Sequence, residues 1–349
     1  MKDRQVIRPF RNITTLLLAL SITACGGGGS SDTDPSPETN DGSQSGASTT
    51  QHAPVIRTYE TGEISESNAV SLVKESFGVL TAIEEDAADY LEELVPLDPD
   101  QLTPYAFENT VSLTEQMCDL GGSARMVIER GQPEITPESF SYFGADDRYR
   151  IEREACASSQ LRAPYKYHGS LSTEVLSGYY DWFDQFAAPN SEILQVYDKF
   201  GIASATSTGS YVHGDINLKL TNGDQISLKG ASLKARSSGF TRHEYYLGDY
   251  HLTLNEVEGL PSYRTAWSMT GAAPFQLGLG SAGLLYDAEI ISGIVYDSWL
   301  GVVQDGSYTL SSGGRMLQVE IFSSHLTYKL DLDQDGMFEI ESMLNDSEY

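Results

Sequence analysis

Basic residues and cysteines are scarce in this sequence. Of its 349 residues, 22 are Lys or Arg and 50 are Asp or Glu, which gives a formal net charge of −28 at pH 7. This charge argues against nucleic acid as a partner and against electrostatic docking on anionic lipid, since both require clustered cations. It favours solubility, divalent cations or a basic partner.

Long apolar runs and the motifs of common enzymes are also missing. The sequence has no GxSxG elbow and no HExxH pair, and its histidines are scattered without metal-ligand spacing. A hydrolase would have to assemble its site from residues far apart in the chain, so we rank an enzyme below the other functional alternatives.

The first 24 residues have the pattern of a secretory signal. A cationic start precedes the apolar run Ile13–Ile22, which has the length of a signal core and is too short to cross a membrane. The run closes on Ile22-Thr23-Ala24-Cys25, which resembles the lipobox of bacterial lipoproteins. In that family Cys25 would be diacylated, the chain cut before it and the new amine acylated. We expect these acyl chains to be the membrane contact; the alternative is an ordinary signal peptide with a chance cysteine.

Residues 25–62 are predicted to form a tether. They are rich in Gly, Ser, Asp, Thr and Pro, with almost nothing apolar before Val55. Such a segment cannot bury enough apolar surface to offset the entropy lost on ordering. Its expected role is to hold a folded body clear of the membrane.

Residues 63–97 are predicted to form one amphipathic helix that belongs to the domain after it. Ser65 or Ser67 can cap its start, and Pro96 stops it. The acidic cluster Glu84–Glu93 falls mostly on the polar face, and we expect a solvated surface there rather than a row of metal ligands. The apolar residues recur in steps of three and four, at Val70, Val73, Phe77, Leu80, Ile83, Ala87, Leu91 and Leu94.

From residue 98 to residue 349 the apolar period changes to two. Short segments rich in Val, Ile, Tyr, Thr and Leu alternate with turn residues. They predict a mainly β domain: a large curved antiparallel sheet, either an open barrel or a two-layer sandwich, with the helix packed on it. The expected strands lie near residues 109–117, 123–130, 139–156, 164–176, 210–220, 225–236, 243–256, 263–270, 287–296, 305–310, 314–322, 325–332 and 337–342.

Glycine pairs and an aromatic run divide these strands. Asn222-Gly223 between two alternating segments predicts a hairpin, and Asp305-Gly306 and Gly313-Gly314 predict further tight turns. Gly278–Gly283 matches GxGxxG, but strand-like residues follow it, so we expect a glycine loop and no dinucleotide site. The aromatic run Tyr179–Tyr197 fits either a strand or a short helix.

Two cysteines remain once Cys25 is lipidated. Cys118 and Cys156 would then lie in a compartment that permits disulfides. A bridge would close a loop of roughly 39 residues and stabilise the fold by about 4 kcal/mol on the chain-entropy model. Two buried free thiols are the alternative. A zinc site is not expected, because neither cysteine has a second ligand at CxxC or HxxxH spacing.

The most chemically specific motif is the acidic run from residue 331 to residue 339. Carboxylates at its first, third and fifth positions, with a glycine at the sixth, can wrap a hard cation. Position 12 is Ser342 rather than the Glu of an EF-hand, and alternating apolar residues flank the run. We therefore predict a strand–loop–strand site for Ca²⁺, with a solvated acidic turn as the alternative. The oxygen donors would come from Asp331, Asp333, Asp335, Met337 (through its main-chain carbonyl) and Glu339.

In this order the motifs resemble those of a group of uncharacterised lipoproteins of Gram-negative bacteria. That group shares a lipobox with a glycine run, a Cys-x-x-Gly-Gly step, a second cysteine ahead of a glycine-containing strand, and a final DxDxDGxxE loop. The resemblance implies anchoring, the disulfide and the fold class, and it brings no activity. Gln334 departs from the small residue expected there. The matching residues are Cys25–Gly29, Cys118–Gly122, Cys156, His168–Gly169 and Leu330–Glu339.

These features favour a tethered cell-envelope lipoprotein with a binding or structural role. Gly26 rather than Asp follows the cysteine, which by analogy with enteric sorting indicates the outer membrane. The 20 Tyr and 3 Trp offer a stacking surface for a protein or polysaccharide. The alternative is a carrier in which sheet and helix enclose a lipid or other apolar ligand, and an apolar cavity between them would indicate it.

We predict that Cys25→Ala abolishes anchoring, because the variant lacks the thiol that would be acylated. Metabolic labelling with a fatty acid and membrane fractionation are the measurements. Unchanged labelling of the variant would refute the lipoprotein interpretation. Fractionation of the wild type with the inner membrane would contradict only the predicted sorting.

Overall fold

The structure is a computed structural model of the chain, and all the residues it describes belong to one compact unit, Gln51–Tyr349. Residues 1–24 and most of the predicted tether lie outside the described residues. The structure describes residues 58–92, 110–114, 118, 120–131, 142–157, 164–181, 186–187, 190–204, 208–221, 225–238, 241–257, 260, 266–280, 283–297, 302–333 and 335–345.

Helix α1 (Ala69–Glu92) begins after Asn68. The Asn68 carbonyl accepts the first helical hydrogen bond, from the Leu72 N–H at 3.0 Å. The Asn68 side chain accepts a hydrogen bond from the Ser65 N–H (2.9 Å) and donates one to the Glu63 carbonyl (2.7 Å). The Asn68 side chain thus fixes the turn just before α1, in which the Ser65 carbonyl accepts from the Ala69 N–H at 3.1 Å, so the predicted start at Ser65 lies in the turn that leads into the helix.

The buried stripe of α1 is rotated from the predicted one. Val70 was expected to be buried but is 39% exposed, whereas Ser76 is fully buried. The steps of three and four are still present, which is why the helix itself was predictable. The buried residues are Ala69, Leu72, Val73, Ser76, Val79, Leu80 and Ile83.

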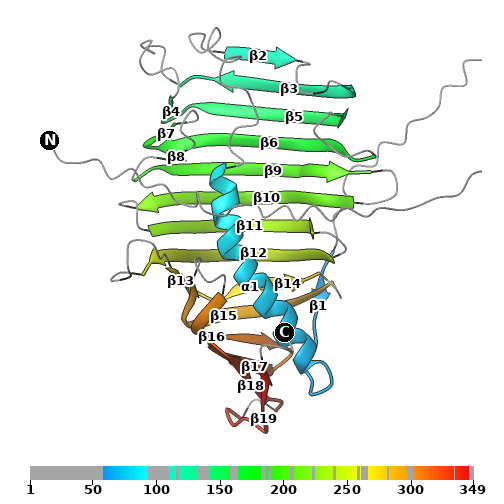
Figure 1. Ribbon diagram of the computed structural model, residues 1–349, viewed down its shortest axis with the longest axis vertical. Helices are drawn as coiled ribbons and strands as arrows, with labels where there is room; N and C mark the ends of the chain where they lie inside the picture. Colours follow the sequence, from blue (N-terminus) through cyan, green and yellow to red (C-terminus); the bar gives the residue numbers. More distant parts are fainter. Residues whose placement is uncertain are drawn as a thin grey trace, which may run out of the picture. The chain divides into compact units, whose positions relative to one another are not determined.

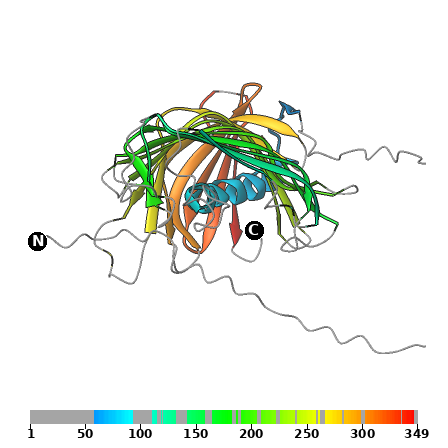
Figure 2. The same cartoon turned by 90° about the horizontal axis from the view of Figure 1, so that it is seen from above.

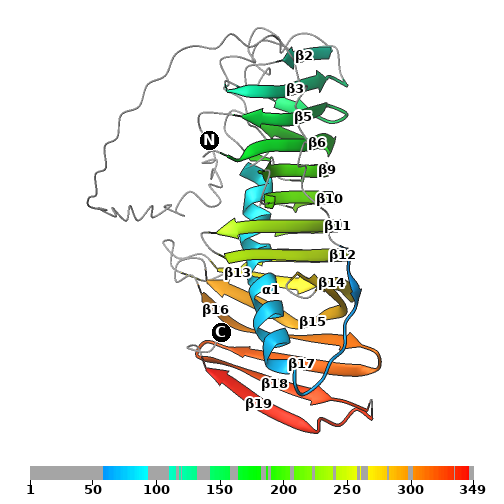
Figure 3. The same cartoon turned by 90° about the vertical axis from the view of Figure 1, so that its right-hand side faces the viewer.

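The predicted mainly β fold is confirmed, and its strands form one large sheet. Sixteen strands pair in the order β19-β18-β17-β16-β15-β13-β12-β11-β10-β9-β6-β5-β3-β2, with β14 pairing with β12 and β15, and β1 with β15. All these pairs are antiparallel except β1 with β15. Figure 1 and Figure 3 show this stack of strands with α1 running across it. In the part of the chain that the structure describes, these sixteen strands thus form one continuous curved sheet (Figure 2).

Most strands overlap the predicted segments, but β14 and the second half of β9 lie outside them. A separate three-stranded sheet joins β4, β7 and β8. The strands are β1 (Glu60–Thr61), β2 (Thr110–Thr114), β3 (Gly121–Glu129), β4 (Tyr142–Gly144), β5 (Arg148–Ala157), β6 (Lys166–Ser177), β7 (Tyr179–Asp181), β8 (Phe186–Ala187), β9 (Glu192–Ala203), β10 (Thr208–Thr221), β11 (Gln225–Ser238), β12 (Thr241–Glu256), β13 (Ala266–Gly271), β14 (Phe275–Leu279), β15 (Leu284–Asp297), β16 (Val302–Ser312), β17 (Arg315–Phe322), β18 (His325–Asp331) and β19 (Ile340–Asn345).

The two faces of the sheet have different environments. Tyr308 of β16 meets Ser76 of α1, and its cross-strand partner Ile290 is on the same face. We call this the inner face. Tyr286 is four positions from Ile290 and also lies on the inner face, so its neighbour Leu285 points to the opposite, outer face. Figure 2 shows the strands curving around α1, which lies inside the curve.

Two predicted features need correction. Asp305 and Gly306 do not form a turn; they lie inside β16, where its register with β15 shifts. Gly306 has a φ of +139°, and a Cβ there would lie 2.7 Å from Cα of Ile294, so glycine is needed for a close approach of the two strands. The end of the predicted tether is also part of the sheet, since Glu60 and Thr61 pair with β15.

Other turn predictions agree with the structure. Gly313 and Gly314 join β16 to β17, and β14 and β15 flank the GxGxxG glycines in place of the helix that a dinucleotide site needs. Within the aromatic run from Tyr179 to Tyr197, the described residues form β7, β8 and the first half of β9. Asn222-Gly223 lies outside the described residues, between the paired strands β10 and β11.

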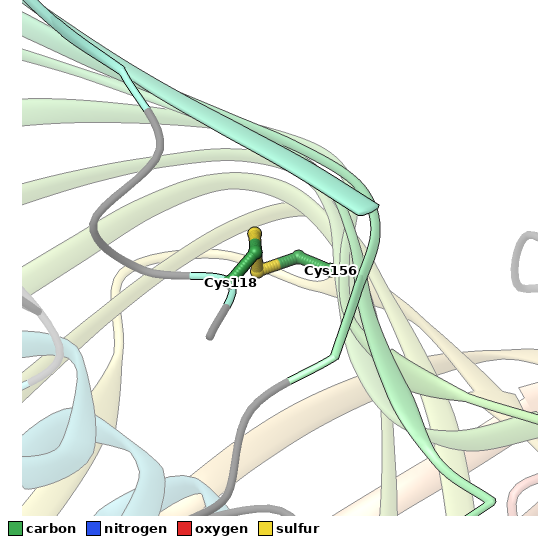
Figure 4. The surroundings of a disulfide bond; sticks show 2 residues. All are labelled: Cys118 and Cys156. Atoms are coloured by element: carbon green, nitrogen blue, oxygen red, sulfur yellow. A yellow bond between two sulfur atoms is a disulfide. The ribbon is translucent and has the colours of Figure 1, made fainter. Parts of the chain in front are cut away.

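The predicted disulfide between Cys118 and Cys156 is present (Figure 4). The two Cα atoms are 5.1 Å apart, and 38 positions separate the cysteines in the sequence. Cys156 is fully buried in β5. The bond joins Cys118, three positions before the start of β3, to the neighbouring strand β5. Beside it, the Leu120 N–H donates to the Ala157 carbonyl (3.1 Å).

We predict that Cys118→Ala lowers the free energy of unfolding by about 4 kcal/mol, since the unfolded chain is no longer cross-linked. Denaturant titration of the variant and the wild type measures the difference. As a control, a reductant should lower the stability of the wild type and leave the variant unchanged. Equal unfolding midpoints for wild type and variant without reductant would contradict the prediction.

A buried hydroxyl pair joins α1 to the sheet. The Ser76 hydroxyl lies 2.8 Å from the Tyr308 hydroxyl and donates to the Leu72 carbonyl (2.6 Å). Since Ser76 donates there, Tyr308 donates to Ser76. Burial raises the pKa of Tyr308, which keeps this donor protonated.

We predict that breaking this hydroxyl pair lowers the free energy of unfolding by unequal amounts, and that the two losses are not additive. Tyr308→Phe should cost about 1 kcal/mol, because Ser76 keeps its bond to Leu72. Ser76→Ala should cost about 1–3 kcal/mol, because the buried Tyr308 hydroxyl loses its short bond. Denaturant titration of both variants and the double variant tests this, and costs that add in full would show that the two hydroxyls do not interact.

Candidate metal-binding loop

The acidic run lies in the loop between β18 and β19. The two strands pair from His325 and Asn345 to Leu330 and Ile340, so the loop begins and ends at fixed positions. The Glu339 N–H donates to the Leu330 carbonyl at 3.0 Å, which closes the loop just inside its last residue. The alternating apolar residues of β18 and β19 thus hold both ends of the acidic run together.

The three aspartates of the loop accept hydrogen bonds from the loop's own backbone. Asp331 Oδ2 accepts from the Gly336 N–H at 3.0 Å, across the loop. Asp333 Oδ1 accepts from the Asp335 N–H (3.3 Å), and Asp335 Oδ1 accepts from the Met337 N–H (2.7 Å). These bonds curl the chain so that successive carboxylates turn to the same side.

Gly336 and Glu339 complete the curl. Gly336 has a φ of +80°, a left-handed conformation that glycine adopts without strain. Glu339 reaches back across the loop, where its Oε2 accepts a hydrogen bond from the Leu332 N–H at 2.8 Å. As a result, Glu339 lies with the aspartates although it is eight residues from the first of them.

The four carboxylates converge on one point. Asp331, Asp333, Asp335 and Glu339 each offer an oxygen, and these oxygens lie within 4.8 Å of one another. Asp331 is buried and the other three are exposed. Like charges this close repel each other unless a cation lies between them. The cluster could hold a metal ion, and an all-oxygen donor set suits a hard cation.

The structure brings together four of the five predicted ligands through their side chains. Met337, predicted to contribute its carbonyl, is 69% exposed, and its N–H is bonded to Asp335. Cys25 lies outside the described residues, as do the side chains of the acidic helix cluster Glu84–Glu93. The disulfide belongs to another part of the sheet.

The described histidines do not form a catalytic group. His251 lies 3.2 Å from the Ser227 hydroxyl, and His213 lies 3.5 Å from a carboxylate oxygen of Asp198. Among the histidine side chains that the structure describes, no one contacts both a serine and a carboxylate. Burial lowers the pKa of His168 and of His251, which favours their neutral forms.

The sequence analysis did not predict a hollow that the structure shows on the outer face of the sheet. It has a volume of about 430 Å³, and Tyr59, His213 and Tyr246 are among its lining residues. Tyr59 had been placed in the tether, and the other two are far apart in the chain. The one sequence signal was the alternation of Tyr and Gly around Tyr246, which fits ordinary strand packing equally well.

In the described part of the chain, no helix combines the length and the apolar character needed to cross a bilayer. Comparison with protein-family models, with curated proteins and with solved structures gave no match. The chemistry of the chain's own residues therefore carries the functional conclusion.

Proposed function

We propose that the protein is a tethered lipoprotein of the bacterial cell envelope, with a binding or structural role, whose last hairpin is stiffened by Ca²⁺. One observation carries the calcium part: four carboxylates converge at the β18–β19 loop. The lipobox-like residues before Cys25 support the anchoring part, and Gly26 supports the outer membrane.

Calcium fits this donor set better than other common ions. The loop offers only oxygen ligands, whereas zinc prefers nitrogen and sulfur. Mg²⁺ requires near-ideal octahedral geometry and keeps its waters, while Ca²⁺ accepts irregular carboxylate clusters. Lys329, the basic side chain nearest in sequence, already pairs with Glu320 at 3.1 Å, so a cation from solution is the better counter-charge.

The binding or structural role has more support than the carrier role. A carrier needs an apolar cavity between α1 and the sheet. The part of α1 whose side chains are described, residues 69–83, instead packs on the inner face with buried side chains such as Leu80 and Ser76. The hollow that the described residues outline lies on the outer face, away from the helix.

We predict that Ca²⁺ raises the melting temperature and that EDTA reverses the effect. Without the position-12 Glu, the dissociation constant should be on the order of 10⁻⁴–10⁻³ M. At a hundredfold excess over that constant the gain is about 2.7 kcal/mol. Mg²⁺ should stabilise less. Differential scanning calorimetry with EDTA, Ca²⁺ or Mg²⁺ is the measurement.

A matched pair of double variants locates the effect. Asp333→Asn/Asp335→Asn removes two proposed ligands and should lose most of the Ca²⁺-induced stabilisation. Asp287→Asn/Glu289→Gln removes two exposed carboxylates of β15 and should keep it. If Ca²⁺ stabilises both double variants equally, the ion only screens an acidic surface, and the loop is a solvated turn.

A further inference from the structure

The hollow on the outer face is built along one row of cross-strand partners. Neighbouring strands place these residues directly beside one another, so their side chains share the outer face. Tyr59 lies two positions before Thr61, which pairs with the last residue of the row. In order across the sheet, the row is His213 of β10, Leu233 of β11, Tyr246 of β12, Gly278 of β14 and Leu285 of β15.

Two glycines leave space for the tyrosine rings to lie against the sheet. A Cβ on Gly278 would lie 2.7 Å from two ring carbons of Tyr59, and a Cβ on Gly248 would lie 2.7 Å from the ring of Tyr246. The missing side chains therefore give each ring a place on the strand surface. The ring centroids of Tyr59 and Tyr246 are 5.8 Å apart, with 30° between the ring planes.

Carboxylates lie beside this row of residues. Asp215 of β10 is the cross-strand partner of Ala231, which lines the hollow. Burial, then the charges of Asp249 and Asp215, raises the pKa of the Tyr246 hydroxyl. Asp198 lies 3.5 Å from Nδ1 of His213 at the other end of the row. Among the described residues that line the hollow, none is Lys or Arg. The hollow thus combines two aromatic rings with negative potential.

We propose that this hollow binds a small organic cation that carries an alkylated ammonium group. Such a group is attracted by aromatic ring faces within about 6 Å and by carboxylates around them. An anion would be repelled by Asp198, Asp215 and Asp249, and a neutral sugar could donate hydrogen bonds to them but would lack the charge attraction that a cation gains. The volume of about 430 Å³ accommodates a compact ligand of this kind.

Choline is the test ligand, and glucose is the neutral comparison. Saturation-transfer NMR on the full mature chain should give a saturable choline signal with a dissociation constant on the order of 10⁻³ M, and no saturable glucose signal. Tyr246→Leu keeps apolar area but removes the ring, and should weaken choline binding about fivefold or more. Asp249→Asn should weaken choline binding as well, because it removes a negative charge near the rings. Asn tolerates the φ of +52° at that position, so the backbone should keep its conformation.

Matched controls separate the hollow from general attraction to an acidic protein. Tyr179→Leu and Glu129→Gln change an exposed tyrosine of β7 and an exposed carboxylate of β3, away from the hollow, and should leave choline binding unchanged. Circular dichroism verifies folding, and Asp215→Asn replaces any variant that does not fold. Equal choline binding by all variants, no saturation by choline, or saturation by glucose lost in Tyr246→Leu would each overturn the proposal.

Discussion

The burial of one face of the large curved sheet is the constraint on which the rest of this structure depends. The inner face carries large apolar side chains, among them Tyr308 and Leu310, that are fully buried. An apolar sheet face must be covered by another element of the domain. Helix α1 is that element where its side chains are described, and the Ser76–Tyr308 hydroxyl pair fixes its position on β16.

This constraint also decides where ligands can bind. Because α1 packs on the inner face, the hollow lies on the outer face, where strand alternation places Tyr246 and Leu285 away from the helix. The acidic loop lies beyond the last paired residues of β18 and β19, where the backbone no longer follows strand geometry and can curl. Both candidate sites therefore lie outside the helix-covered face, and a change in either need not disturb the packing of α1.

The fold class could be predicted from the sequence because the spacing of apolar residues and the turn residues between elements are local properties. The alternation in β16 to β19 and the steps of three and four in α1 each follow from a single element. The turn at Asp305-Gly306 was predicted wrongly, because the close approach of β15 that requires Gly306 comes from a strand encoded elsewhere. The acidic loop was predictable because its four carboxylates lie close together in the sequence, from Asp331 to Glu339. The hollow was not, because its row is created by register among five strands.

Charge connects the two candidate sites. With 50 acidic and 22 basic residues, most carboxylates cannot pair with a side chain of opposite sign. Pairs that do form on the surface, such as Arg148 with Glu174 at 2.6 Å, are solvent-screened and contribute little each. Unpaired carboxylates are tolerable where water reaches them, and they become a source of affinity where the backbone brings several together. The loop concentrates them around a point suited to a metal ion, and the outer-face hollow adds aromatic rings suited to an organic cation. Under the two proposals, the same excess of negative charge would give two different selectivities, because the groups placed beside it differ.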